Sequence, residues 1–79
     1  MKIRVLFFGA TAEMVGKREV DATLGEFGSP EDVVQTLIAD HPGLGIRRLL
    51  FSVNEEYVSP TSRLRDGDEL AIFTPVSGG

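Results

Sequence analysis

One strong helix signal stands between two groups of strand-like segments, and it limits the folds open to the chain. Ser29-Pro30-Glu31-Asp32 combines a serine N-cap, a proline at the first helical position and acidic residues in the first turn. The helix is expected to stop by His41, because Pro42 and Gly43 follow it. An apolar stripe runs along one side of this helix. Its members are Val33, Val34, Leu37 and Ile38.

Strand-like segments precede and follow this helix. Two lie before it, with a short helix at 10–15 between them that stops at Gly16, and three lie after it. Residues 43–48 are expected to form a loop, and turns are expected at Asn54-Glu55-Glu56 and Asp66-Gly67. The expected strands are Lys2 to Phe8, Arg18 to Leu24, Leu49 to Asn54, Tyr57 to Ser59 and Asp68 to Thr74.

This order favours an α+β domain in which one main helix lies across one face of a mixed sheet. We therefore expect the β-grasp, ubiquitin-like arrangement over residues 1–73, with the first and last strands side by side at the centre. A flexible C-terminal tail is expected over residues 74–79, ending in Gly-Gly. The predicted core joins the helix stripe to one face of the two central strands. That face carries Ile3, Val5, Phe7, Leu70 and Ile72.

The opposite face of the predicted sheet also carries apolar side chains. Leu6, Phe8 and Phe73 alternate onto it. Because soluble monomers seldom leave such a patch without a use, this face is predicted to contact a partner protein. Incidental cover by loops is the alternative.

The tail indicates where the chemistry takes place. Neither Gly78 nor Gly79 has a Cβ, so this segment can enter a channel too narrow for other residues, and 74–79 can reach about 20 Å when extended. A terminal carboxylate is an anion at neutral pH and a poor electrophile, so it has to be activated from outside. A frayed chain end is the alternative reading.

Composition excludes several classes of function. The chain has no cysteine, which removes disulfides, thiolate metal sites and cysteine nucleophiles and favours a reducing cytoplasm. A net charge of −4 disfavours nucleic acid and anionic membranes as partners. No segment predicts a signal peptide or a membrane span. The single histidine, His41, lacks companions for a metal or catalytic site, so neither a metal nor a stably bound cofactor is expected.

Three segments together resemble the sulfur-carrier subunits of molybdopterin synthase, within the ubiquitin-like sulfur carriers. They are Val5-Leu6-Phe7-Phe8, Val53-Asn54, and the run from Leu64-Arg65-Asp66-Gly67-Asp68-Glu69 into Phe73-Thr74-Pro75-Val76-Ser77-Gly78-Gly79.

The resemblance implies a carrier cycle. An ATP-using adenylyltransferase, related to ubiquitin-activating enzymes, adenylates Gly79, and a sulfur donor converts it to a thiocarboxylate. Pro75, Val76, Ser77 and Gly78 then enter the active site of the synthase large subunit, where the sulfur passes to cyclic pyranopterin monophosphate. The chain would be non-catalytic by itself, within a heterotetramer that makes the molybdenum cofactor.

By the same resemblance, Phe8, Tyr57 and Phe73 would contact both partners. Ala12 stands where some relatives place a basic residue, which leaves the ionic contact of the short helix in doubt. Two alternatives share the Gly-Gly end: a thiamin-type sulfur carrier, and a ubiquitin-like modifier joined through Gly79 to lysines of other proteins. A non-covalent adaptor using only the sheet face is a third.

Overall fold

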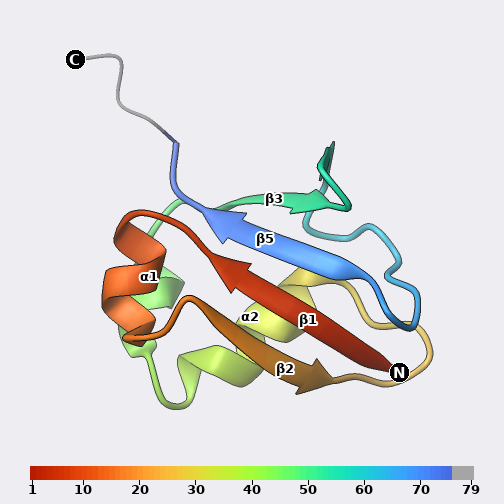
Figure 1. Ribbon diagram of the computed structural model, residues 1–79. Helices are drawn as coiled ribbons and strands as arrows, with labels where there is room; N and C mark the ends of the chain where they lie inside the picture. Colours follow the sequence, from red (N-terminus) through yellow and green to blue (C-terminus); the bar gives the residue numbers. More distant parts are fainter. Residues whose placement is uncertain (76–79) are drawn as a thin grey trace.

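The computed structural model describes residues 1–75 and confirms the β-grasp arrangement (Figure 1). Five strands form one sheet in the order β2-β1-β5-β3-β4, with α2 packed across one face. The predicted tail residues Val76, Ser77, Gly78 and Gly79 lie outside the described residues. The elements are β1 (Lys2–Phe7), α1 (Ala10–Val15), β2 (Glu19–Thr23), α2 (Pro30–Ile38), η1 (Pro42–Ile46), β3 (Leu50–Val53), β4 (Glu56–Val58) and β5 (Glu69–Phe73).

The first and last strands pair in parallel at the centre of the sheet, as predicted. Val5 lies opposite Leu70, and Phe7 lies opposite Ile72. All other pairs are antiparallel. Since β1 and β5 run in the same direction, they end at the same edge of the sheet, close to α1 (Figure 1). We call this edge, from which residues 74 and 75 leave the sheet, the tail edge.

The main helix begins as its sequence predicts. Ser29 and Asp32 form a capping box: the Ser29 amide donates to Asp32 Oδ2 (2.9 Å), and the Asp32 amide donates to Ser29 Oγ (3.4 Å). The Glu31 amide donates to the Pro60 carbonyl (2.9 Å), which ties the start of the helix to the loop before β5. The helix ends at Ile38, within the predicted limit.

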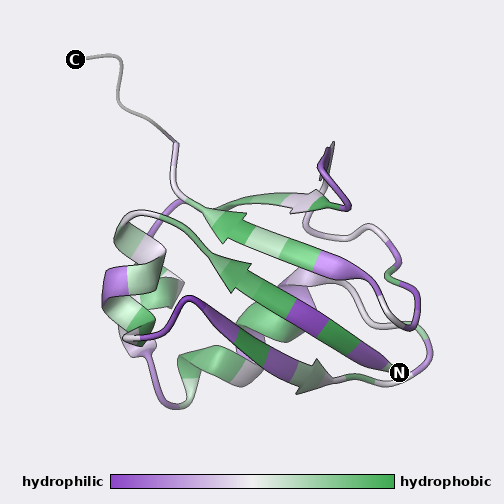
Figure 2. Ribbon diagram, viewed as in Figure 1, coloured by the Kyte–Doolittle hydropathy of each residue, from purple (hydrophilic) through white to green (hydrophobic). Residues whose placement is uncertain are grey.

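The core lies between α2 and one face of the sheet, and hydrophobic residues follow the central strands (Figure 2). Every predicted sheet residue of the core is buried, as are Val33 and Val34. Leu37 and Ile38 are only half-buried, because they occupy the last turn of α2, beside η1. The sequence reading did not place several other members in the core. These are Val15, Leu44, Phe51 and Leu64.

Two local predictions are corrected. Residues 43–48 are not all loop, because a 3-10 helix, η1, covers Pro42–Ile46 and carries Leu44 into the core. The turn between β3 and β4 is one residue shorter than predicted, and β4 begins at Glu56. Asn54 and Glu55 adopt positive φ angles of 49° and 72°, the geometry of a two-residue hairpin turn that matches the twist of its strands.

Candidate functional site

The face of the sheet opposite α2 is uncovered and carries the predicted contact residues. Strand register decides which side chains share it: Leu6 lies beside Ala71, Ala71 beside Ser52, and Ser52 beside Tyr57. Directly paired residues point to the same side of a sheet, so these four strands contribute to one surface. We call this surface the open face. Its larger apolar members are Leu6, Phe8, Leu50, Tyr57 and Phe73.

The three aromatic residues of the predicted interface therefore stand on one surface. The rings of Tyr57 and Phe73 meet with centroids 5.8 Å apart and planes tilted by 59°, a favourable arrangement for aromatic rings. Tyr57 is 79% exposed and Phe8 is 53% exposed. Apolar side chains that are exposed and gathered on one face in this way are typical of surfaces that bind another protein.

Phe8 separates two hollows on the open face. One lies at the tail edge and is lined by Phe8, Phe73 and the first residues after β5, Thr74 and Pro75. Its floor is made by small residues, Gly9, Ser52 and Ala71, which leave room for a side chain from outside. The base of the tail and the aromatic residues therefore form one continuous surface.

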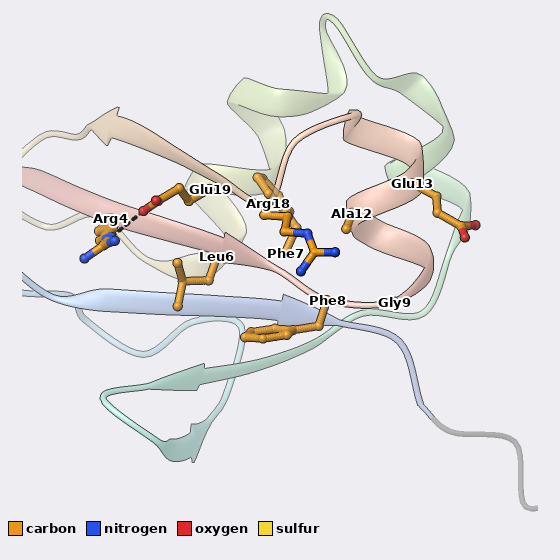
Figure 3. A pocket seen from close by; sticks show the side chains of 9 residues that line it. All are labelled: Arg4, Leu6, Phe7, Phe8, Gly9, Ala12, Glu13, Arg18 and Glu19. Carbon is orange, nitrogen blue, oxygen red and sulfur yellow. Dashed lines mark hydrogen bonds and ion pairs between the residues drawn. The ribbon is translucent and has the colours of Figure 1, made fainter.

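The second hollow lies between β1, β2 and α1 (Figure 3). Its apolar wall is made by Leu6, Phe8 and Ala12, and the side chain of Arg18 lies over this wall. At its other end Arg4 and Glu19 form an ion pair, drawn as a dashed line in Figure 3. Among residues 1–75 no carboxylate pairs with Arg18.

The Arg4–Glu19 ion pair shifts the pKa of each group in the direction that favours its charged form. A hydrogen bond from Arg4, reinforced by its charge, holds the pKa of the Glu19 carboxyl below its usual range. The same contacts raise the pKa of Arg4. Both side chains are about half exposed, so the ion pair covers part of the open face while its charges stay in contact with solvent.

A buried threonine holds the tail edge together. The side-chain oxygen of Thr11, at the start of α1, lies 2.8 Å from the carbonyl oxygens of both Phe8 and Ile72. It also accepts a hydrogen bond from the Phe8 amide (3.1 Å). One fully buried hydroxyl thus joins α1 to the ends of β1 and β5 and fixes the backbone from which Phe8 projects.

Of the remaining predicted site residues, some lie inside and some outside the described part of the chain. Pro75 lies at the base of the tail and is exposed, whereas the predicted reacting residue, Gly79, lies outside the described part with Val76, Ser77 and Gly78. His41 is the N-cap of η1 and lines no hollow described above. Within residues 1–75, no cluster of three or more potential metal ligands occurs. No helix in that range is long and apolar enough to span a bilayer.

Sequence reasoning did not single out Thr11 or Ser52. Thr11 stands among small residues, Gly9, Ala10 and Ala12, that give no sign of its burial, and one of its partners, the Ile72 carbonyl, is distant in the sequence. Ser52 could be found only after β3 was placed beside β5. Arg18 was predicted only as the first residue of a strand. Its place in the second hollow depends on the path of the chain from α1 into β2, which the sequence does not reveal.

Comparison with known proteins gives a consistent result. Residues 5–79 match the sequence model of the ThiS family. The molybdopterin synthase sulfur carrier subunit of Chlamydomonas reinhardtii is 41% identical, over 100% of both chains. The subunit with the same name from Escherichia coli is 41% identical, over 98% of this chain and 99% of its own.

Solved structures share the fold. SAMP1 of Haloferax volcanii, a small archaeal modifier protein, superposes with a TM-score of 0.83 and 27% identity, over 100% of both chains. A chain in the complex of subunits 1 and 2 of the molybdopterin-converting factor from Helicobacter pylori matches with a TM-score of 0.65 and 20% identity, over 100% of both chains. At that identity the second match shows only that the fold is shared.

Proposed function

Since the chain belongs to the ThiS family, we propose that it is the sulfur-carrier subunit of a molybdopterin synthase. The observation that carries the proposal is the full-length match to curated carrier subunits, 41% identical over 100% of both chains in the Chlamydomonas case. The fold supports it, because the last central strand leads directly into the segment that ends in Gly78-Gly79.

In this proposal the reacting group is the carboxylate of Gly79. With no cysteine in the chain, sulfur bound covalently for transfer has no side-chain thiolate to reside on, and the terminal carboxylate is the remaining position. An adenylyltransferase joins AMP to this carboxylate and releases pyrophosphate. A sulfur donor then displaces AMP, and Gly79 becomes a thiocarboxylate.

The described residues would dock the carrier rather than perform the chemistry. Phe8, Tyr57 and Phe73 would bury apolar surface against each partner in turn, and Thr11 would keep Phe8 fixed to the tail edge. Pro75 has a restricted φ, so less conformational entropy is lost when the tail enters a cleft. The two partners are the synthase large subunit, which uses the sulfur, and the adenylyltransferase, which prepares the tail.

Intact mass spectrometry tests the cycle. The full chain is incubated with ATP, the adenylyltransferase and a sulfur donor, and then with the large subunit and cyclic pyranopterin monophosphate. We expect a mass gain equal to replacement of one oxygen by sulfur, lost again only when both later components are present. A chain lacking Gly79 is the matched control and should gain nothing.

The possible outcomes separate the related carriers. One outcome is that a thiazole-forming synthase reverses the sulfur mass gain and the large subunit does not. That result would make the chain a thiamin-type carrier and overturn the proposal. Absence of any gain with an active adenylyltransferase would overturn sulfur carriage altogether.

A second candidate function is protein modification, which the likeness to SAMP1 of Haloferax volcanii favours. In that case the adenylated Gly79 would react with a lysine amine of another protein and release AMP. Lysine-linked adducts that form in extract with the full chain, and that disappear when Gly79 is deleted, would support this role. An adaptor that acts without covalent chemistry would instead keep its function after that deletion.

A further inference from the structure

Charged side chains are distributed unevenly between the ends of the sheet. Four of the eight cations and two of the twelve carboxylates lie near the tail edge, a net charge of +2, when Glu19, which follows Arg18 but is paired with Arg4, is counted with the rest. The rest of the chain carries four cations and ten carboxylates, a net charge of −6. The residues near the tail edge are Lys17, Arg18, Arg47 and Arg48, with Glu13 and Asp40. An acidic protein therefore presents a basic end.

Strand register places the cations on both sides of the tail base. The Phe7 amide donates to the Arg18 carbonyl (2.9 Å), so Arg18 lies beside the end of β1. Leu50 pairs with Phe73, so Arg48, two residues before Leu50, lies near the end of β5 from which the tail leaves. The strands β2, β1, β5 and β3 are neighbours at a spacing of about 4.8 Å, so the cations flank the base of the tail across about 15 Å.

These cations are not neutralised within the described structure. The ion pairs found among residues 1–75 join Arg4 to Glu19 and to Glu69, and none includes the four tail-edge cations. All four are exposed. Arg63, by contrast, stacks on the Phe27 ring, 4.7 Å from its centroid. Lys2 and Arg65 also form no ion pair among residues 1–75, but they lie where carboxylates outnumber cations, whereas the basic end carries an excess of positive charge.

We propose that the tail-edge cations dock against carboxylates that surround the cleft of the adenylyltransferase. This inference rests on the proposed function. The four residues after Pro75 can reach about 14 Å when extended, so the cations would meet the rim of the cleft and not the reacting group. Arg18 lies over an apolar wall, so the second hollow suits a glutamate, whose methylene groups pack while its carboxylate pairs.

Electrostatics give a reason for this arrangement. An enzyme that holds ATP beside the Gly79 carboxylate brings two anions together, and the carrier as a whole is negative. Attraction between the basic end and an acidic rim would orient the carrier with its tail toward the cleft and raise the association rate. Salt would weaken this attraction, because the groups are exposed.

Stopped-flow association with the adenylyltransferase tests the proposal. The double variant Arg47→Gln/Arg48→Gln, and separately Arg18→Gln, should lower the association rate constant about three- to tenfold at low salt. The difference should vanish in high salt. The matched control, Lys2→Gln/Arg65→Gln, removes the same charge at the opposite end and should leave the rate unchanged.

Two results would overturn the inference: equal rates for all variants at low salt, or a loss equally large in the control, which would show that only total charge matters. An effect seen with the large subunit and not with the adenylyltransferase would also reject it. Adenylate formation on Gly79 at saturating enzyme is measured in parallel. If it occurs with every variant while the rates do not differ, the docking proposal fails and the carrier function stands.

Discussion

The two ends of the central strand pair are built in different ways. At the end where β5 begins, exposed polar groups satisfy one another: the Lys2 amide donates to Asp66 Oδ1 (2.7 Å), and the Arg65 amide donates to Asp68 Oδ2 (2.8 Å). At the tail edge a buried hydroxyl, Thr11, does the joining, and the exposed ring of Phe8 stands near cations that form no ion pair among residues 1–75. One end is held by exposed hydrogen bonds between backbone amides and carboxylates, while the other is held from inside and presents an apolar and basic surface.

The largest expected effect concerns binding at the tail edge. Phe8→Ala should weaken binding to the synthase large subunit by about 2 kcal/mol or more, roughly 30-fold in Kd, because Phe8 is an exposed aromatic on the proposed interface. Phe27→Ala is the matched control, since Phe27 is also an exposed aromatic (68%) but lies outside the open face. The affinities are measured by calorimetric titration. Equal losses of affinity in the two variants would show that the open face binds the large subunit no more specifically than the surface around Phe27.

The next effect tests how the tail edge is held. Thr11→Val keeps the shape but leaves the Phe8 and Ile72 backbone groups without the hydroxyl, so the free energy of unfolding should fall by about 1–3 kcal/mol. Thr11→Ser retains the hydroxyl. Hydrogen exchange at the Phe8 amide should therefore accelerate in the valine variant only. Equal acceleration in both variants would assign the role to packing of the threonine methyl.

A smaller effect is expected at the opposite end. The Asn54 side chain donates to Asp68 Oδ1 (3.2 Å) and accepts from the Glu69 amide (3.2 Å), while its backbone has a φ of 49°. Asn54→Ala should cost about 1 kcal/mol in urea unfolding, because it loses both bonds and fits this φ poorly. Asn54→Gly tolerates the φ and should cost less. Binding to either partner should not change, and a change would contradict the separation of the two ends.

The smallest effect comes from the Arg4–Glu19 pair between the two ends. Because Arg4 lowers the pKa of Glu19 in the folded state, the pair stabilises the fold above the ordinary glutamate pKa of 4.5. This contribution is lost as pH falls through the lower folded value. Stability measured from pH 6 down to pH 3 should therefore decline less steeply in Glu19→Gln than in the parent chain. An identical decline would show that the exposed pair contributes nothing measurable.

The sequence predicted the architecture because its local signals agreed with one another. Alternation in β1 and the capping box of α2 appear within short windows, and both match the observed elements. Leu44 was assigned to a loop because Pro42, Gly43 and Gly45 around it suggest irregular chain, yet the 3-10 helix turns its side chain into the core. Only the tertiary arrangement of α1 and η1 reveals such burial.

The candidate site was predictable only in part. Phe8 and Phe73 could be placed on one face by period-two alternation, and Tyr57 was named through the family resemblance. The Thr11 bridge and the basic end depend on contacts between segments far apart in the sequence, such as Thr11 with Ile72 and Leu50 with Phe73. Such contacts leave no local signature in the sequence.

The parallel pairing of β1 with β5 also has a consequence for biosynthesis. Ile3 and Val5 are made first, but they cannot be buried between neighbours until Leu70 and Ile72 have left the ribosome. The domain must therefore complete its synthesis before it can complete its core, and incomplete chains would expose the central strand to degradation. A chain that stops before β5 lacks the strand that completes the core beside β1.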